Sequence, residues 1–249
     1  QQVELKEHWE YDTIQRSEVK RHLNEYFYYG GLPEILSFKN KRAMLSSLYQ
    51  KIYLGDICAR NNIKNDRVLN ILIKKMAESV KQPLSYNRLK NVIVATGSPI
   101  SVPTTIDYVD YASDSWLILP MENEVGKLTE KEMQKKYYFV DNGLLNLFLM
   151  NSETSLLENM VAVELCRRFG KKNVFFLNAE KEIDFIVPDE KLAIQVSYSI
   201  KDETTYNREV PPLAKYAKAH KDWKCLLITY DEEGTEEGIT VVPVWKWLM

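Results

Sequence analysis

The sequence predicts a protein of mixed α and β structure (α+β or α/β), and three observations along the chain support this. Residues 1–60 carry the pattern of successive helices. Residues 61–127 combine helices with a pair of strands, and residues 128–249 alternate helix and strand in the order αβββαβ. Because such alternation favours a mixed sheet covered by helices, we expect the last segment to form an α/β domain.

The first sixty residues predict two main helices. The stretch "SEVKRHLNEYFYY" begins at Ser17, a residue type that caps helix starts, and stops at Gly30–Gly31, with Pro33 close behind. A second helix is expected over residues 41–60. The chain opens at Gln1 directly in charged helical sequence, so we expect a further segment upstream of it.

Residues 61–127 have the element order of a winged helix, namely helix, helix, turn, helix and a strand pair. The first of these helices, "NDRVLNILIKKMAESV", has apolar side chains at helical spacing. Further helices are expected near 85–96 and 103–114, and the strands in "WLILPMENE" and "KKYYFVD". An inconspicuous linker near 126–135 leads into the second half.

Residues 128–249 supply the helices and strands of the α/β domain. The amphipathic helix "SLLENMVAVELCRRFG" ends at Gly170, and the runs "NVFFL", "EIDFIV" and "LAIQVSYS" predict three strands. The next helix, "TYNREVPPLAKYAKAH", contains Pro211 and Pro212, which we expect to begin or break it because proline has no backbone N–H. The runs "KCLLITY" and "ITVVPVW" predict the closing strands.

Polar side chains interrupt the two strands that the short link "PDEK" joins. If Val187 pairs with Leu192, the same register sets Asp184 directly opposite Gln195, with Cβ atoms about 4.5–5.5 Å apart. Alternation along the first strand then puts Glu182, Asp184 and Ile186 on one face and Ile183, Phe185 and Val187 on the other. On the partner strand, the polar side carries Ala193, Gln195 and Ser197. The hairpin therefore predicts a pocket with a carboxylate, a carboxamide and a hydroxyl.

These motifs resemble those of known families. The stretches "SLLEN", "EIDFIV" and "IQVS" are similar to the PD-(D/E)xK, restriction-endonuclease-like core, which has an acid on its first helix, an acid on its second strand and (E/Q)-x-K on its third. With "YFYYGGLPEIL", "KIYLGDICARN" and "YFVDNGLL", nearly the whole chain resembles the C-terminal region of a bacterial and archaeal family of AAA-type ATPases, a region of unknown function. In that family an ATPase module lies upstream. This chain has no G-x-x-x-x-G-K-[ST] loop, so we expect no ATP site in it.

The endonuclease resemblance implies a candidate catalytic site at Glu158, Asp184, Gln195 and Ser197. Glu158, Asp184 and the amide oxygen of Gln195 would hold Mg²⁺, which polarises a phosphodiester and lowers the pKa of bound water. The lysine of the pattern falls at Ser197, and loss of one preorganised group commonly costs about 10²–10³ in rate. Lys191 and Lys201 lie off the relevant face of the strand, so the implied site is degenerate.

The same residues also allow purely structural interpretations. Ser155 and Glu158 would form a capping box at the start of a helix. Asp184 would form an ion pair with Arg208 or a lysine, and Gln195 and Ser197 would hydrogen-bond to each other.

The charge pattern of residues 61–127 disfavours docking in a DNA major groove. Between Asn91 and Gly126 there are five acids and no Lys or Arg. Asp107, Asp110 and Asp114 form an acidic stripe along the helix that would enter the groove, where cations are needed for the phosphates. Basic residues occur nearby on a different face and suit non-specific phosphate contacts: Lys74, Lys75, Lys81, Arg88 and Lys90.

The composition limits the classes of protein to which the chain can belong. The net charge is -2, so any attraction to nucleic acid must come from a local patch. Three separated cysteines argue against a disulfide framework and a zinc cluster and favour a reducing compartment. The apolar runs are far shorter than the roughly 20 residues of a membrane span, so we expect a cytoplasmic protein without a membrane partner.

Together these observations favour a non-catalytic accessory role as the C-terminal region of an AAA-type ATPase, in which the chain recognises nucleic acid or a partner protein. The motivation is that both modules resemble nucleic-acid folds while their chemical parts are reduced. The enzyme alternative is a Mg²⁺-dependent DNA nuclease that uses Glu158, Asp184 and Gln195. The third is a protein-interaction or oligomerisation module, which the acidic helix and an aromatic surface (15 Tyr, 5 Trp) would suit.

Overall fold

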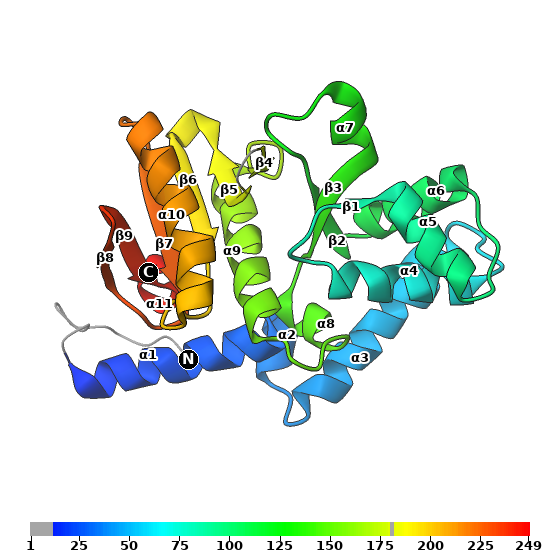
Figure 1. Cartoon of the computed structure of the whole chain (residues 1–249). Helices are drawn as coiled ribbons and strands as arrows, with labels where there is room; N and C mark the ends of the chain where they lie inside the picture. The colour runs from blue at the N-terminus through cyan, green and yellow to red at the C-terminus, as the bar shows by residue number, and fades with distance from the viewer. Residues whose placement is uncertain (1–11, 180–181) are drawn as a thin grey trace.

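The computed structural model describes residues 12–179 and 182–249, which form a mixed α+β structure with two sheets (Figure 1). Of the helical segment expected over residues 1–60, residues 1–11 lie outside the described residues. The remainder is helical as predicted, in α1 (Thr13–Tyr29), α2 (Pro33–Leu36), α3 (Lys41–Lys51) and a π-helix (Ile52–Ala59). No helix in the described part of the chain has the length and apolar character needed to cross a membrane.

The end of α1 is fixed by Gly30, which has a φ of 79°. A Cβ at this position would meet the carboxylate of Asp141, and Asp141 Oδ2 accepts the Gly31 N–H at 2.8 Å. Asp141 also caps the short helix α8 (Asn142–Asn146). One buried carboxylate thus ties the N-terminal helices to the middle of the chain.

The smaller sheet has the strand order β1-β3-β2, with antiparallel pairing. The elements in chain order are α4 (Asp66–Glu78), β1 (Leu84–Ser85), α5 (Tyr86–Ala95), α6 (Val102–Asp114), β2 (Ile118–Met121), α7 (Leu128–Met133) and β3 (Gln134–Phe139). The two longer strands pair as the sequence predicts. Strand β1 is only two residues long, too short to show any periodicity in the sequence, and α7 occupies much of the span expected to be a linker.

The larger sheet has the order β4-β5-β6-β7-β9-β8. Its elements are α9 (Glu153–Phe169), β4 (Phe175–Asn178), β5 (Glu182–Val187), a 3₁₀ turn (Pro188–Glu190), β6 (Leu192–Val196), α10 (Glu203–Ala219), β7 (Lys224–Thr229), β8 (Gly234–Glu236), β9 (Ile239–Pro243) and α11 (Val244–Trp247). Strands β4, β5 and β6 form an antiparallel meander, and β6, β7 and β9 run parallel. The predicted order αβββαβ is therefore observed.

Helix α9 lies between the two sheets, against β3 on one side and β6 on the other (Figure 1). Its apolar residues belong to the main core, which also contains Phe27, Tyr138 and Phe185. Helix α10 covers the opposite face of the larger sheet over a smaller core that includes Val210 and Leu213. Each side of the larger sheet thus has its own helical layer, and α9 also supports the smaller sheet.

The two sheets are joined where β2 ends and β4 begins. Phe176 N–H donates to Glu122 O at 3.0 Å, and Glu124 N–H donates to Phe176 O at 2.8 Å. The side chain of Asn123 reinforces this junction: its Nδ2 donates to Asn178 O at 3.2 Å, and its Oδ1 accepts the Asn178 N–H at 3.0 Å. The strand pairing fixes the smaller sheet relative to the larger one.

Helix α10 runs without a break through Pro211 and Pro212, so the expectation that they begin or break it is wrong. A proline inside a helix costs about 3 kcal/mol because a hydrogen bond is lost and the ring meets the preceding turn. Here Val210, Pro212 and Leu213 are buried against the sheet. Burial of a large apolar side chain stabilises by about 1.5–3 kcal/mol, so packing offsets the backbone cost.

Candidate active site

Three carboxylates surround the ammonium group of Lys136, which is fully buried. Its Nζ lies 3.3 Å from Glu158 Oε1, 3.0 Å from Glu182 Oε1 and 3.3 Å from Asp184 Oδ1. The lysine comes from β3 in the smaller sheet, whereas the acids come from α9 and β5. We call these four residues the acid–lysine cluster.

Strand β3 aims Lys136 and Tyr138 at the same region because alternate residues of a strand share a face. The Tyr138 hydroxyl donates to Glu158 Oε1 at 2.8 Å, and its ring lies 5.5 Å from that of Phe185. Lys135, one residue earlier, pairs with acids outside the cluster. One oxygen of Glu158 therefore accepts from two donors of β3.

Glu158 reaches the cluster from the interior of α9, not from its start. The helix begins at Glu153 with Ser152 in the capping position, so the capping box expected for Ser155 and Glu158 is wrong. Burial raises the pKa of Glu158 to about 7, although the nearby Lys136 ammonium acts in the opposite direction. Burial thus favours the protonated form of this carboxyl group.

The hairpin of β5 and β6 has the predicted register, shown by the pairs Phe185 with Ile194, Ile186 with Ala193 and Val187 with Leu192. At the next residue pair, Asp184 and Gln195, side chains form hydrogen bonds with the backbone. The Asp184 N–H donates to Gln195 Oε1 at 3.3 Å, and the Val196 N–H donates to Asp184 Oδ2 at 2.9 Å. The carboxylate of Asp184 is thereby held on the backbone of its neighbouring strand.

The strict alternation expected along β5 is wrong, because Ile183 and Ile186 pack in the same core. Across from them, Leu177 pairs with Ile183 and Phe175 with Ile186, so β5 has one more residue than β4 over this stretch. Such a bulge bends the strand and re-aims a side chain, and bulges are frequent beside active sites. Here it lets Asp184 face Lys136 between two core positions.

The carboxamide of Gln195 turns toward α10. Its Nε2 donates to Glu209 Oε2 at 2.6 Å, and Arg208 Nε donates to Glu209 Oε1 at 2.7 Å. Ser197 Oγ donates to Ser199 O at 3.0 Å. Gln195 and Ser197 thus bond other partners instead of each other, contrary to expectation. Arg208 pairs with Glu209, and the ion pair expected for Asp184 is formed with a lysine, Lys136.

The acid–lysine cluster holds more negative than positive charge. Burial opposes the charge on Lys136, but Glu158, Asp184 and Glu182 outweigh it and raise the pKa of the ammonium above its ordinary value. The N–O distances of 3.0–3.3 Å exceed the roughly 2.7–2.9 Å usual for charge-assisted bonds. One ammonium is shared among three acceptors, so the carboxylates are incompletely neutralised.

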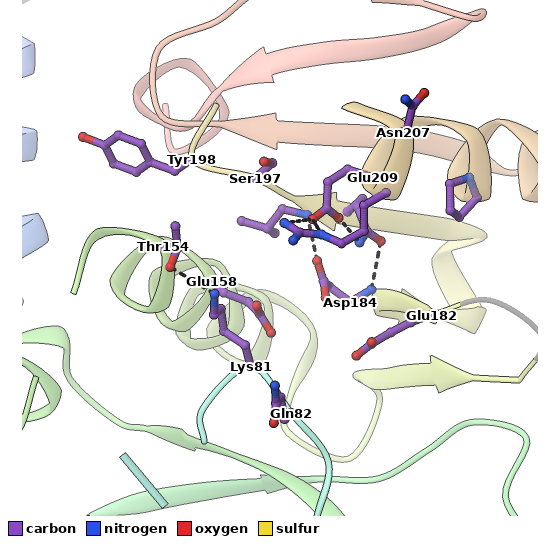
Figure 2. Close-up of a pocket in the computed structure, with 14 residues that line it drawn as sticks. Lys81, Gln82, Thr154, Glu158, Glu182, Asp184, Ser197, Tyr198, Asn207 and Glu209 are labelled. Atoms are coloured by element: carbon purple, nitrogen blue, oxygen red, sulfur yellow. Dashed lines mark hydrogen bonds and ion pairs between the residues drawn. The ribbon is translucent and has the colours of Figure 1, made fainter. Parts of the chain in front are cut away.

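A cavity of about 460 Å³ opens in front of these carboxylates. Figure 2 shows Glu158, Glu182 and Asp184 pointing toward a common region from α9 and β5. The rest of the lining is mixed in character. Lys81 and Gln82 come from the loop before β1, Thr154 from α9, Gln195 and Val196 from β6, Ser197 and Tyr198 from the segment after it, and Asn207, Arg208, Glu209 and Pro212 from α10. The acids thus line the cavity, with a lysine and an arginine on separate elements around them.

The donor set suits a hard divalent cation. Glu158 and Asp184 each approach the same ammonium to 3.3 Å, so one cation is within reach of both. The described residues contain no group of three or more His, Cys, Asp or Glu with the geometry of a complete metal site. Mg²⁺ needs none, since it commonly binds one or two carboxylates and completes its shell with water and substrate phosphates. Gln195, expected as a third ligand, directs its amide oxygen at the Asp184 N–H.

The structure brings all four sequence-predicted residues to one cavity, which Glu158, Asp184, Gln195 and Ser197 line together. Lys136, which contacts the acids from the opposite sheet, was not predicted from the sequence. The available signal was the alternation in "KKYYFV", which puts Lys136 on the same face as Tyr138. That signal is weak because lysines near a strand start are ordinarily solvated.

Comparison with known proteins identifies the family of the chain. Residues 20–155, more than half of the chain, match a family described as a domain of unknown function, DUF8612. The chain belongs to this family. The DUF8612 match contains Lys136 and ends before Glu158, so it covers the lysine of the cluster and not its acids.

Two uncharacterized proteins are similar over nearly the whole chain. One, from Methanocaldococcus jannaschii, is 31% identical over 259 residues, which cover 95% of this chain and 57% of the relative. The other, from Haemophilus influenzae, is 30% identical over 241 residues, which cover 93% of this chain and 58% of the relative. The chain therefore spans less than two thirds of the length of these relatives. No solved structure matches the chain significantly.

Proposed function

We propose that the chain binds a nucleic-acid strand in the cavity beside the acid–lysine cluster and hydrolyses a phosphodiester bond with the help of Mg²⁺. The observation that carries this proposal is the convergence of Glu158 and Asp184 on one ammonium at the floor of a polar cavity. Buried acids that share too little positive charge are costly for stability alone, and perturbed groups in a cleft favour a functional role.

The contacts suggest a role for each acid. Glu158 and Asp184 would hold Mg²⁺, which when bound polarises the phosphate and lowers the pKa of a bound water. The Tyr138 hydroxyl orients Glu158, and the Val196 N–H orients Asp184. Lys136 lessens the repulsion between the two carboxylates, which would otherwise have to be buried next to each other unpaired.

The groups around the acids suit the substrate. Lys81 and Arg208 lie on separate elements that line the cavity, where their charges can meet the phosphates on either side of the scissile bond. Tyr198 also lines the cavity, and its ring stacks on that of Tyr230 at a centroid distance of 4.8 Å. Contacts with phosphates do not depend on the base sequence, so we propose a substrate with an accessible strand and little sequence preference.

We also propose a fold family for each half of the chain. The order α4, β1, α5, α6, β2, α7, β3 with strand order β1-β3-β2 supports a winged helix with a short helix between its two longer strands. The order α9, β4, β5, β6, α10, β7, with an antiparallel meander followed by a parallel strand, supports the restriction-endonuclease-like core. We also retain the proposal that the chain works as the C-terminal part of an AAA-type ATPase; relatives nearly twice its length leave room for such a module.

Nuclease activity is tested with plasmid and single-stranded DNA in the presence of Mg²⁺ or Mn²⁺. We expect nicking by the wild-type chain and a loss of about 10²–10³-fold or more in Asp184→Asn. The matched control is Asp189→Asn, an exposed acid in the turn of the same hairpin, which should keep full activity. Equal activity in both variants, or none in the wild type with either metal, would contradict the proposal.

A second candidate, recognition without cleavage, is favoured by Ser197. The resemblance places a lysine at this position, and the observed lysine stands behind the acids and does not line the cavity. In that case the wild-type chain binds single-stranded DNA in a gel shift, shows no cleavage, and loses affinity in Lys81→Ala with Arg208→Ala. The cavity then serves as a binding groove only.

Helix α6 is unsuited to DNA in either case. Its acidic stripe, Asp107, Asp110 and Asp114, is exposed as the sequence predicts. Next to it, the chain after β2 is engaged with β4 and not free to lie along a duplex. We propose that this face meets a basic protein surface.

A further inference from the structure

We infer that Lys136 is an exchangeable internal cation, which neutralises Glu158 and Asp184 in the metal-free protein and gives way when a divalent cation binds them. The inference rests on the proposed function for its purpose, because it describes how the same acids are kept ready for a metal. It assigns Lys136 a regulatory part that neither the family nor the resemblance provides.

The ammonium of Lys136 stands where a metal shared by both acids would bind. It lies at 3.3 Å from both Glu158 Oε1 and Asp184 Oδ1, between the two groups that would ligate a metal. Two cations at this spot would repel each other strongly in a buried setting. A metal that uses both carboxylates therefore requires the ammonium to move or to lose one of these contacts.

Lys136 has a partner with which it can stay paired when it moves. Glu182 Oε1 is its nearest acceptor at 3.0 Å, and the Glu182 side chain is 46% exposed where it lines the cavity. The lysine can thus release the two buried acids and stay paired with Glu182. The ammonium then stands nearer the phosphate of a substrate, where a positive charge is useful.

The charge of the cluster also favours the exchange. Three carboxylates against one ammonium leave an excess of negative charge. A divalent cation supplies the additional positive charge that a single lysine does not. The metal-bound state with Lys136 on Glu182 is closer to neutral than the metal-free state.

The main experiment measures Mn²⁺ binding by titration calorimetry and by the loss of the free Mn²⁺ electron spin resonance signal. The probes are the wild-type chain, Lys136→Met and, as a matched control on the same strand, Lys135→Met. We expect Lys136→Met to bind Mn²⁺ about tenfold or more tightly than the wild type, because the competing ammonium is gone. Lys135→Met should equal the wild type, and Lys136→Met with Asp184→Asn should lose the gain.

Equal Mn²⁺ affinity in Lys136→Met and the wild type would overturn the inference. Should Lys136→Met fail to fold, the wild-type chain supplies the second measurement: amine acylation followed by mass spectrometry. Saturating Mn²⁺ should increase labelling at Lys136 and leave Lys135 unchanged. Protection of Lys136 that does not change with Mn²⁺ would equally reject the exchange.

These outcomes are separable from those of the cleavage assay. If Lys136→Met gains Mn²⁺ affinity while no chain cleaves DNA, the exchange holds and the nuclease proposal fails. If the wild type cleaves DNA and Lys136→Met binds Mn²⁺ no better, the nuclease proposal holds and the exchange fails.

Discussion

At the level of single residues, the unusual feature is a fully buried lysine whose partners are three acids. A buried ion pair adds little net stability because desolvation of both charges opposes their attraction. Removal of one partner is a different matter, since the other charges stay buried without compensation. Lys136 is accordingly the residue on which the acids of the cavity depend most.

We expect Lys136→Met to lower the free energy of unfolding by about 3–5 kcal/mol at neutral pH, because Glu158 and Asp184 then lack their counter-ion. Urea unfolding followed by circular dichroism measures this change. Lys136→Met combined with Glu158→Gln should recover part of the loss. A change below about 1 kcal/mol in the single variant would mean that the cluster is already neutral without the lysine.

The stability of the protein should depend on pH through Glu158. Its folded pKa is raised by burial to about 7 from the ordinary value of 4.5, so the folded state binds a proton that the unfolded state releases. This contribution is complete below pH 4.5 and is lost as the pH rises through 7. We expect the decline in unfolding free energy over this window to be shallower in Glu158→Gln; parallel pH profiles of variant and wild type would refute the assignment.

At the level of elements, features that depend on neighbouring residues could be predicted from the sequence, and features that depend on distant residues could not. The hairpin register followed from a four-residue link, since a short turn fixes how its strands pair. The bulge at Asp184 could not be predicted, because it depends on how β4 lies beside β5. Lys136 is 48 residues from Asp184, and no local pattern joins them. The two metal-ligand candidates were therefore found from sequence, and their counter-ion was not.

Helix α10 is a second case in which packing against the rest of the fold overrides a local sequence signal, and its two prolines allow a test. Pro211 is only partly buried, whereas Pro212 packs in the core. Pro211→Ala restores a helical hydrogen bond without loss of core contacts, so we expect it to stabilise the protein by about 1–2 kcal/mol. Pro212→Ala should gain less because it also removes buried surface. Thermal unfolding of both variants gives the comparison, and a lower melting temperature for Pro211→Ala would contradict it.

At the level of the whole molecule, the cations proposed to contact a nucleic acid lie at the cavity and not on α6. Lys81 and Arg208 line the cavity among its carboxylates, whereas α6 exposes its acidic stripe. The net charge of -2 does not show where these cations lie. Because each released counterion adds to the salt dependence of nucleic-acid binding, the binding surface can be located by which residues change that dependence.

We expect Lys81→Ala with Arg208→Ala, made in the cleavage-deficient Asp184→Asn chain, to weaken single-stranded DNA binding and to reduce its salt slope by about 1–2. Replacement of the three α6 aspartates by asparagine should leave both unchanged or slightly raise the affinity. Fluorescence anisotropy at several salt concentrations provides the measurement. If only the variant with the three α6 aspartates replaced altered the salt slope, the DNA-binding surface would have to be assigned to α6 and not to the cavity.

The origin of Lys136 in the smaller sheet also governs how this chain can be divided. A fragment that starts after Phe139 would retain Glu158, Glu182 and Asp184 and would lack both the lysine and the Tyr138 hydroxyl. Such a truncated half would carry an uncompensated acidic interior and the uncovered edge of β4. It should be recovered folded, if at all, only under mildly acidic conditions, so deletion boundaries for this family belong upstream of β1.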